Sequence, residues 1–333
     1  MDAITLVFGT ERRGIDIPQV GPDFSSNVPR VFIAGELGGM GLIRNAIEQG
    51  KQAISSMRAL PRSSNKDMLD VAIVGAGPAG FAATLAAHSH GLRYVTVEQE
   101  SLGGTVFQFP RGKLVMTAPV DLPIVGKVKL RETSKEALLA LWESIESETG
   151  IKINYNERVE KIESNDDGVA VVTSKSSYRC KAVLLTIGRR GTPRKLGVPG
   201  EELPKVVYRL IDPAQYRGTK LLVVGGGDSA LEAALSVAEE PDTEVTISYR
   251  GDAFSRAKPK NRDRIAAAEK EGQLKVALGS TVKSIAPDEV ELAYGEDVSR
   301  LANDAVLVCA GGILPTKFLQ DIGVSVETKY GTA

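Results

Sequence analysis

The sequence predicts an α/β protein built from two Rossmann-like dinucleotide-binding domains, each with the three layers of a ββα arrangement. Two segments carry this prediction, because each joins an apolar strand to a glycine cluster and then to a helical pattern. The two strands are 71–74 and 221–224. The length of 333 residues agrees with this prediction, since one domain takes about 150 residues.

The composition is that of an ordinary soluble globular chain, with 42% apolar and 25% charged residues. Forty-one basic and 42 acidic side chains leave a formal net charge of −1, so no overall field attracts nucleic acid or an anionic membrane. No run approaches the ~18 apolar residues of a membrane span, and the start lacks the pattern of a secretory leader. The two cysteines are far apart, which argues against a metal cluster and favours a reducing cytoplasm.

The stretch between the two glycine clusters predicts one helix and then several strands. Residues 135–147 place apolar side chains on one face of a helix. Residues 151–186 are strand-rich and are interrupted by the turn-forming run 165–168. Ahead of the first long strand, residues 61–68 are polar and turn-prone, so we expect them to form a linker.

The first glycine cluster has the spacing G-x-G-x-x-G at the start of a helix. Gly75 suits the tight turn, Gly77 lets the backbone approach a pyrophosphate, and Gly80 lets the helix pack on the strand. The helix N-terminus then faces the phosphates with its partial positive charge. Glu98 ends the next strand, where its carboxylate can accept hydrogen bonds from a ribose. The predicted binding residues are Gly75, Gly77, Pro78, Ala79, Gly80 and Glu98.

The second glycine cluster repeats this pattern, but its following strand leads to Arg250 instead of an acid. Arg250 and Arg256 could clamp a 2′-phosphate, which favours NADPH over NADH. The alternative is that these arginines belong to a solvated basic surface with Lys258 and its neighbours. The predicted binding residues are Gly225, Gly227, Asp228, Ser229, Ala230, Arg250 and Arg256. One nucleotide in each unit indicates hydride transfer between a nicotinamide and a flavin.

Together these motifs resemble those of the thioredoxin reductase-like flavoproteins, within the class II pyridine nucleotide-disulfide oxidoreductases. The loop Gly103-Gly104-Thr105 is similar to the segment that leads beneath the flavin in that family. Gly188 is similar to the glycine that follows a strand before the crossover between the two domains. The resemblance implies FAD and NADPH as cofactors, and a homodimer.

One motif of that family stands at the wrong end of this chain. Gly35 and Glu36, followed by a helix start at Leu42 and Ile43, resemble the family's last FAD motif, yet they precede the first glycine cluster. In the family a Gly-Asp pair holds the ribitol, and the helix N-terminus faces the flavin pyrimidine. We therefore expect a circular permutation. The alternative is that residues 38–41 form only a glycine-rich loop.

This permutation sets the expected domain boundaries. Residues 1–205 together with 301–333 are predicted to form the FAD-binding domain, in which 1–60 is the permuted motif. Residues 206–300 are predicted to form the NADPH-binding domain.

The thiol pair that thioredoxin reductases carry just before the second glycine cluster is missing, since Tyr208 and Ile211 stand at those positions. Thiol exchange needs an attacking and a resolving sulfur, so dithiol reductase activity is not expected. Relatives that reduce low-molecular-weight disulfides place a cysteine within the first glycine cluster. In this chain the cluster reads Gly-Ala-Gly-Pro-Ala-Gly and contains no cysteine. Cys180 and Cys309 lie on apolar strands and are expected in the core.

The sequence thus predicts an NADPH-dependent flavoprotein oxidoreductase that passes electrons through FAD to an iron–sulfur acceptor of the ferredoxin type, without a catalytic side chain. Residues 2–7 resemble the strand after the last Cys-Pro of two-cluster ferredoxins, so the acceptor could be an upstream domain or subunit; an ordinary first strand is the alternative. Two other functions remain open. One is a non-catalytic FAD- and NADPH-binding module or subunit of a larger redox complex, and the other is an NADPH oxidase or quinone reductase.

Overall fold

The computed structural model describes residues 15–38, 42–60, 67–109, 113–116, 118–129, 132–189 and 191–329. The ferredoxin-like stretch 2–7 and the linker residues 61–66 lie outside this part. The chain forms two compact units. Unit 1 comprises residues 1–107, 112–191 and 314–333, and unit 2 comprises residues 108–111 and 192–313.

The main sheet of unit 1 is mixed. Its members are β2 (Val31–Ile33), β3 (Leu69–Val74), β4 (Tyr94–Val97), β9 (Val159–Asn165), β10 (Gly168–Thr173) and β11 (Ser177–Leu185). The order is β4-β3-β11-β10-β9, and β2 also pairs with β11. The pairs β4–β3, β3–β11 and β11–β2 are parallel, whereas β9, β10 and β11 form an antiparallel meander.

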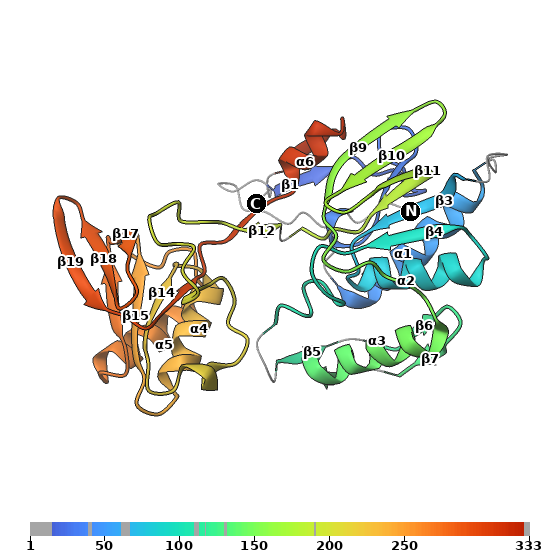
Figure 1. Ribbon diagram of the computed structural model, residues 1–333. Coiled ribbons are helices and arrows are strands. Elements are labelled where there is room, and N and C mark those ends of the chain that lie inside the picture. Colours follow the sequence, from blue (N-terminus) through green and yellow to red (C-terminus); the bar gives the residue numbers. More distant parts are fainter. Residues whose placement is uncertain are drawn as a thin grey trace. The chain divides into compact units, whose positions relative to one another are not determined.

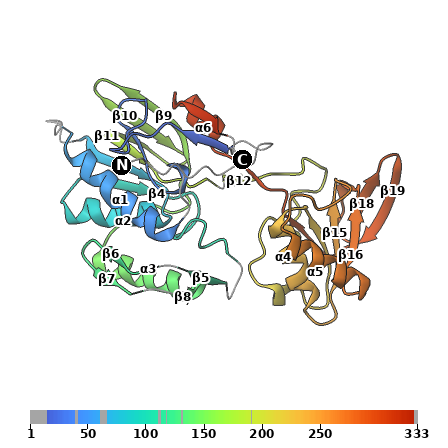
Figure 2. The ribbon, with the colours of Figure 1, turned by 180° about the vertical axis from the view of Figure 1, so that it is seen from behind.

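Two helices cover one face of this sheet, α1 (Ile43–Arg58) and α2 (Pro78–Ser89) (Figures 1 and 2). Alternate residues of β3 face opposite sides, because side chains of a strand alternate. Val71 and Ile73 pack with residues of α1 and α2. Ala72 and Val74 pack instead in a cluster that includes residues of β9, β10 and α6 (Thr316–Asp321). The parallel strands of unit 1 therefore lie between two layers, with α1 and α2 on one side and β9, β10 and α6 on the other.

A second group of elements in unit 1 surrounds α3 (Lys135–Thr149), which corresponds to the helix predicted over 135–147. Ser134 caps it by accepting the N–H of Ala137, and the ring of Trp142 lies 5.8 Å from that of Phe81 in α2. Two short antiparallel pairs lie in the preceding segment. They are β5 (Leu114–Met116) with β8 (Glu132–Ser134), and β6 (Val120–Leu122) with β7 (Gly126–Val128).

Residues from the two ends of the sequence pair in unit 1. Strand β1 (Ile15–Pro18) is antiparallel to β22 (Val326–Lys329), with Ile15 opposite Lys329 and Pro18 opposite Val326. This is the register of a β-hairpin whose turn would run from Lys329 to Ile15. The carboxylate of Asp16 strengthens the contact by accepting hydrogen bonds from the hydroxyls of Thr316 and Thr328, at 3.0 and 2.8 Å.

Unit 2 has the predicted three layers. Its parallel sheet, in the order β13-β20-β14-β15-β16, consists of β13 (Val206–Val207), β14 (Lys220–Val224), β15 (Glu244–Tyr249), β16 (Lys275–Leu278) and β20 (Ala305–Val308). The antiparallel layer consists of β17 (Thr281–Ile285), β18 (Glu289–Tyr294) and β19 (Asp297–Ala302), and the helices are α4 (Asp228–Ala238) and α5 (Pro259–Lys270). Leu221 and Val223 pack with the helices, and Leu222 packs with the antiparallel layer. A short pair joins β12 (Thr192–Pro193) to β21 (Gly312–Ile313).

The two compact units divide the chain at other positions than the predicted domains do. Residues 192–205 and 301–313, which the sequence pattern places with the FAD-binding domain, lie in unit 2. The first segment joins because Pro199 accepts the N–H of Ile285 and Leu203 packs in the core of unit 2. The second joins because β20 pairs in parallel with β14.

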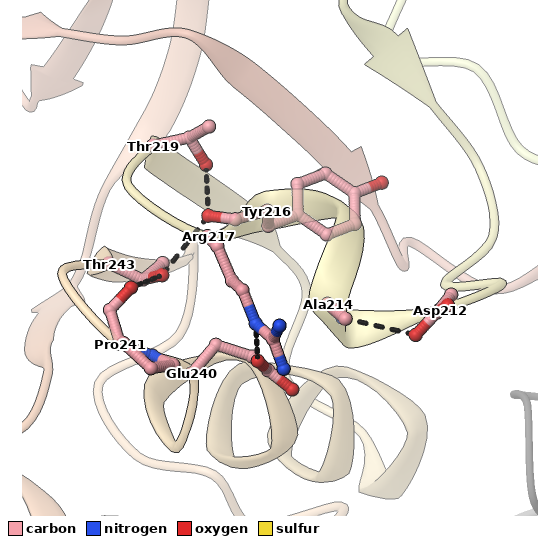
Figure 3. A network of polar contacts seen from close by, with 8 residues as sticks. All are labelled: Asp212, Ala214, Tyr216, Arg217, Thr219, Glu240, Pro241 and Thr243. Carbon is pink, nitrogen blue, oxygen red and sulfur yellow. Dashed lines mark hydrogen bonds and ion pairs between the residues drawn. The ribbon is translucent and has the colours of Figure 1, made fainter.

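A polar network surrounds the segment that leads into β14 (Figure 3). Asp212 caps the 3-10 helix η2 (Pro213–Tyr216) by accepting the N–H of Ala214 at 3.1 Å. The carbonyl oxygen of Tyr216 accepts hydrogen bonds from the hydroxyls of Thr219 and Thr243. This network fixes the segment that follows the positions of the missing thiol pair.

Candidate functional site

The first glycine cluster forms the turn between β3 and α2. A β-carbon at Gly75, where φ is +104°, would lie 2.7 Å from the carbonyl oxygen of Thr186. A β-carbon at Gly80 would overlap the carbonyl oxygen of Gly75. Both positions therefore require glycine, the first for the turn and the third for close packing of helix on strand.

Glu98 lies beside this turn, at the end of β4. One carboxylate oxygen accepts the N–H of Ala76 at 2.7 Å, and the other accepts the N–H of Glu100 at 2.9 Å. The residue is only 7% exposed. Burial raises the pKa of Glu98, and the two backbone donors oppose that shift. The carboxylate is thus held in a defined orientation next to the glycine cluster.

The loop of Gly103, Gly104 and Thr105 contacts the same turn. The N–H of Gly103 donates to the carbonyl oxygen of Ala76 at 3.0 Å. A β-carbon at Gly104 would lie 3.1 Å from the Cα atom of Gly77. Thr105 is half-buried in the following turn. The structure therefore brings the first glycine cluster, Glu98 and this loop together in unit 1.

The N-terminus of α2 is open to a ligand. Gly77 is its N-cap, no side chain caps it and its first turn contains no acid. Pro78 has no N–H, but the N–H groups of Ala79 and Gly80 have no acceptor within the helix. A β-carbon at Gly77 would meet only the Cα atom of Gly104, at 3.9 Å. These residues fit the pyrophosphate of a dinucleotide.

The motif that precedes the first glycine cluster in the sequence, Gly35-Glu36 with the helix start at Leu42, lies beside that cluster in unit 1. A β-carbon at Gly35 would be 3.0 Å from the Cβ atom of Ala79, and the N–H of Gly35 donates to Gln49 at 2.8 Å. Leu42 is the exposed N-cap of α1, followed by the half-buried Ile43, and no side chain caps this helix either. Residues 39–41 lie outside the described part.

Glu36 lies in the 3-10 helix η1 (Glu36–Gly38) directly after Gly35. Its negative charge acts on Arg189, whose guanidinium donates to the carbonyl oxygen of Asp16 at 3.1 Å. Burial lowers the pKa of Arg189, and the charges of Glu36 and Asp16 oppose that shift. The sequence pattern predicts a ribitol contact for Glu36 but does not reveal this neighbouring charge, which is distant in sequence.

Gly188 lies just beyond β11. Two residues earlier, the hydroxyl of Thr186 donates to the carbonyl oxygens of Val74 and Gly75, at 2.8 and 3.0 Å. A β-carbon at Gly188 would meet nothing within 4 Å. Thr186 thus ties the end of β11 to the first glycine cluster and leaves the backbone of Gly188 open.

The second glycine cluster forms the turn between β14 and α4 in unit 2. A β-carbon at Gly225 would overlap the carbonyl oxygen of Cys309, whereas one at Gly227 would meet nothing within 4 Å. Ser229 is exposed and Ala230 is fully buried in the first turn of α4. The turn is tight at its first glycine and open at the helix start, as a phosphate-binding turn requires.

Asp228 has partners that the sequence reasoning missed. Its Oδ1 atom accepts the N–H of Lys258 and the side-chain amide of Asn261, both at 2.8 Å. These hydrogen bonds lower the pKa of Asp228. The contact joins α4 to the start of α5 across about thirty residues, so no local pattern could have found it.

Arg250 and Arg256 lie on the loop between β15 and α5, and both are exposed. In the described part of the chain, neither guanidinium forms an ion pair with a carboxylate. Both are therefore available to an anionic ligand.

The two cysteines occupy separate units. Cys180 is buried in β11, its thiol lies 3.5 Å from the carbonyl oxygen of Val169, and burial raises its pKa to about 12. Cys309 follows β20 in unit 2 and is half-buried. At the positions of the missing thiol pair, the hydroxyl of Tyr208 donates to Glu201 at 2.7 Å, and Ile211 is exposed.

Among the described residues, no helix has both the length and the apolar character needed to cross a membrane. The longest, α1, has 16 residues.

Comparison with known proteins identifies the family. The family model for pyridine nucleotide-disulphide oxidoreductases matches residues 72–332. A ferredoxin–NADP reductase of Ignicoccus hospitalis is 32% identical over 219 residues, which are 66% of this chain and 67% of that protein. The bacilliredoxin reductase Bdr of Bacillus subtilis is 26% identical over 78% of this chain and 82% of its own length.

A solved structure agrees with this match. A thioredoxin reductase of Lactococcus lactis is similar with a TM-score of 0.56 and 26% identity, over 77% of this chain and 81% of that one. Proteins of the matching family use FAD and NADPH, the two predicted cofactors. With a dinucleotide-type glycine turn in each of its units, the chain is an NADPH-dependent flavoprotein oxidoreductase and belongs to the pyridine nucleotide-disulphide oxidoreductase family.

Proposed function

We propose that unit 1 binds FAD, that unit 2 binds NADPH, and that electrons leave FAD for a protein acceptor of the ferredoxin type without passing through a thiol. The observation that carries the assignment is the contrast between the two glycine turns. A buried carboxylate, Glu98, stands beside the first, and two unpaired arginines follow the strand after the second. Bound FAD supplies the chemistry of accepting hydride and releasing electrons singly.

In unit 1, the adenosine end of FAD would lie at Glu98, whose oxygens retain lone pairs for ribose hydroxyls. The pyrophosphate would lie at the N-terminus of α2, against Gly77 and Ala79. Gly103, Gly104, Thr105 and Gly188 would line the flavin, and the N-terminus of α1 at Leu42 and Ile43 would favour negative charge on its pyrimidine edge.

In this arrangement the carboxylate of Glu36 would contact the ribitol, with the charge of Arg189 acting on it. The place of Glu36 directly after Gly35, whose backbone approaches Ala79 of the first glycine cluster, supports a contact with the ribitol. No side chain has to act as acid or base in hydride transfer, so the residues of unit 1 position the flavin and exclude water.

In unit 2, the helix start at Gly227 would face the NADPH pyrophosphate, and Arg250 and Arg256 would bind the 2′-phosphate. Replacing both arginines by glutamate tests this assignment. The affinity for NADPH should fall by about 1.5–3 kcal/mol per lost charged hydrogen bond, with little change for NADH. Equal losses for both nucleotides would contradict the assignment.

Two relatives suggest different electron acceptors for this chain. The Ignicoccus protein is named a ferredoxin–NADP reductase. The Bacillus protein is named a bacilliredoxin reductase. Disulfide exchange needs a thiolate. The thiol of Cys180 is buried and has a raised pKa, and the first glycine cluster contains alanines where a cysteine would be needed. Both observations favour a ferredoxin-type acceptor.

An anaerobic titration with NADPH separates the candidates. We expect the flavin absorbance to bleach, and to return when an oxidised ferredoxin is added but not when a bacilliredoxin disulfide is added. Recovery with the disulfide would overturn the thiol-free route. Persistent yellow colour would indicate a non-catalytic module, and recovery at turnover rates with air or a quinone alone would indicate an oxidase or quinone reductase.

We also propose that the order of segments in unit 1 is a circular permutation of the family's order. The family match begins at residue 72, after the segment that contains β2 and α1. That segment nevertheless supplies a parallel strand beside β11 and a glycine contact to Ala79. The hairpin register of β22 with β1 supports an original connection from Lys329 to Ile15.

The hairpin register gives the test. A reordered chain would begin at Asp67, run to Lys329, continue through an Asn-Gly turn into Ile15 and end at Leu60. Asn-Gly suits two-residue hairpins, so we expect this chain to fold and to bind FAD. A reordered chain that stays folded in unit 2 but loses FAD would contradict the permutation.

A further inference from the structure

Four residues form a polar bracket between the two helices of unit 2: Asp228 and Glu232 on α4, Lys258 at the N-cap of α5, and Asn261 in its first turn. Asp228 accepts the N–H of Lys258 and the amide of Asn261. The same amide donates to Glu232 at 3.1 Å. One amide group, in a residue only 7% exposed, thus serves two carboxylates that lie one helical turn apart.

The bracket fixes one end of the loop that carries the two arginines. At its other end the loop continues from β15, where the ring of Tyr249 stacks on that of Phe254 at 5.6 Å. Phe254 and Ala257 are buried in the helix-side core, and the N–H of Ala257 donates to Phe254 at 3.1 Å. Arg256 therefore extends from a short exposed segment whose two flanks are held.

The position of Asp228 gives this bracket a second consequence. A carboxylate in the first helical turn beside a phosphate site would repel the ligand. Here the Oδ1 atom is engaged from the side by two donors of α5, at 2.8 Å each. The acid that adjoins the glycine turn is thereby used to hold the basic loop.

We propose that Asp228 and Asn261 are positioning residues that hold Arg256 for the 2′-phosphate, so that the bracket determines the preference for NADPH over NADH. This inference rests on the proposed binding of NADPH by unit 2. Arginine loses rotamer freedom when it binds a phosphate, and a loop fixed beforehand reduces that cost. Because the bracket acts on the loop that carries Arg256, we expect it to matter most for a nucleotide that carries the 2′-phosphate.

The test uses calorimetric binding of 2′,5′-ADP and of 5′-AMP to the FAD-loaded protein. Asn261→Asp places a third carboxylate against Asp228 and Glu232. We expect it to weaken 2′,5′-ADP binding by about tenfold, equivalent to about 1.4 kcal/mol, and to change 5′-AMP binding less than about twofold. The ratio of kcat/KM for NADPH to that for NADH should fall in parallel, through KM.

Exchange of the two groups provides the rescue. The double variant Asp228→Asn with Asn261→Asp restores a donor opposite an acceptor between positions 228 and 261 but leaves a carboxylate facing Glu232, so it should recover part of the lost preference. The matched control is Gln273→Glu, which makes the same change of amide to acid beside Glu271, just beyond the C-terminal end of α5. It should leave both affinities unchanged.

The outcomes separate this inference from the proposed function. If Arg256→Gln abolishes the 2′-phosphate preference but Asn261→Asp weakens both ligands equally, the bracket is merely structural and the inference fails. If Arg256→Gln and Arg250→Gln leave the preference intact, the assignment of NADPH to unit 2 fails instead. Should Asn261→Asp not fold, Asn261→Ser removes the amide without adding charge and should weaken 2′,5′-ADP binding alone, by about threefold.

Discussion

The two glycine turns share a sequence pattern but differ in the residue that follows the next strand. In unit 1, Glu98 is buried and both of its oxygens accept backbone N–H groups. In unit 2, Arg250 is exposed and forms no ion pair among the described residues. A buried acid fixed by its own backbone suits a cofactor that stays bound, whereas exposed cations suit a substrate that enters and leaves. The comparison suggests that the same glycine turn can hold either a permanently bound cofactor or a nucleotide that exchanges.

The turns also differ in how closely helix and strand approach. In unit 1 the third small position must be glycine, because a β-carbon at Gly80 would overlap Gly75. In unit 2 the same position is Ala230, whose Cβ atom lies 3.1 Å from where a β-carbon of Gly225 would be. The second helix therefore lies far enough from its strand to admit a methyl group.

The largest effect on the free energy of unfolding is expected at the ion pair of Asp70 and Lys181 in the sheet of unit 1. Asp70 on β3 lies 2.9 Å from the ammonium of Lys181, with both side chains largely buried. In unit 2, Asp304 also stands near the start of a strand, but it is exposed and accepts the backbone N–H of Lys220. Asp70→Asn should lower the free energy of unfolding of unit 1 by about 3 kcal/mol, whereas Asp304→Asn should cost unit 2 less than about 1 kcal/mol. Urea denaturation with a probe in each unit measures both.

The stability that Asp70 contributes to unit 1 depends on pH. Burial raises the pKa of Asp70, but hydrogen bonds and charge from Lys181 and Arg93 outweigh it and hold the pKa below its usual value. The stabilisation is therefore complete above pH 3.8, the usual value, and is lost as the pH falls through the lowered pKa. The difference between wild type and Asp70→Asn should shrink below that pH; a constant difference would contradict the ion pair.

An intermediate effect is expected at the third small position. Gly80→Ala should destabilise unit 1 by about 2–3 kcal/mol, since the helix must move away from the strand, and FAD should be lost with it. The reciprocal change, Ala230→Gly, should cost unit 2 only about 1 kcal/mol, the ordinary penalty of glycine in a helix. Unfolding curves and the flavin content of the purified protein test the pair. A mild Gly80→Ala would mean that the two turns pack alike.

The smallest effect is expected from Glu98→Gln. The amide keeps the shape of the side chain but turns one acceptor into a donor, which would face the N–H of Ala76 or of Glu100. FAD affinity should fall by about tenfold, or about 1.4 kcal/mol, while NADPH affinity should not change. Fluorescence of released flavin measures the first and calorimetry the second. A shared loss would link Glu98 to both nucleotides and remove the distinction between the units.

The sequence predicted the parts of the fold that local sterics determine. The tight turn at Gly75 and the helix over 135–147 follow from spacing and periodicity, and both are present. The turn at 165–168 is present too, because Asn165 accepts the N–H groups of Asp167 and Gly168 just ahead in the chain. In each case the residues that decide the structure are close neighbours in sequence.

The features that escaped prediction depend on partners distant in sequence. The apolar pattern of 305–308 indicates a buried strand but not which sheet it joins, and it joins β14 instead of the sheet of unit 1. The partners of Asp228 lie 30 and 33 residues away. Such contacts depend on the assembled units, so no motif contains them.

The ladder between β1 and β22 has a mechanical consequence. Ile15 and Lys329 sit opposite each other at the same end of the ladder, so tension applied through them would peel the pairs apart one after another instead of shearing them together. The ladder would yield at low force, ahead of the parallel core strands.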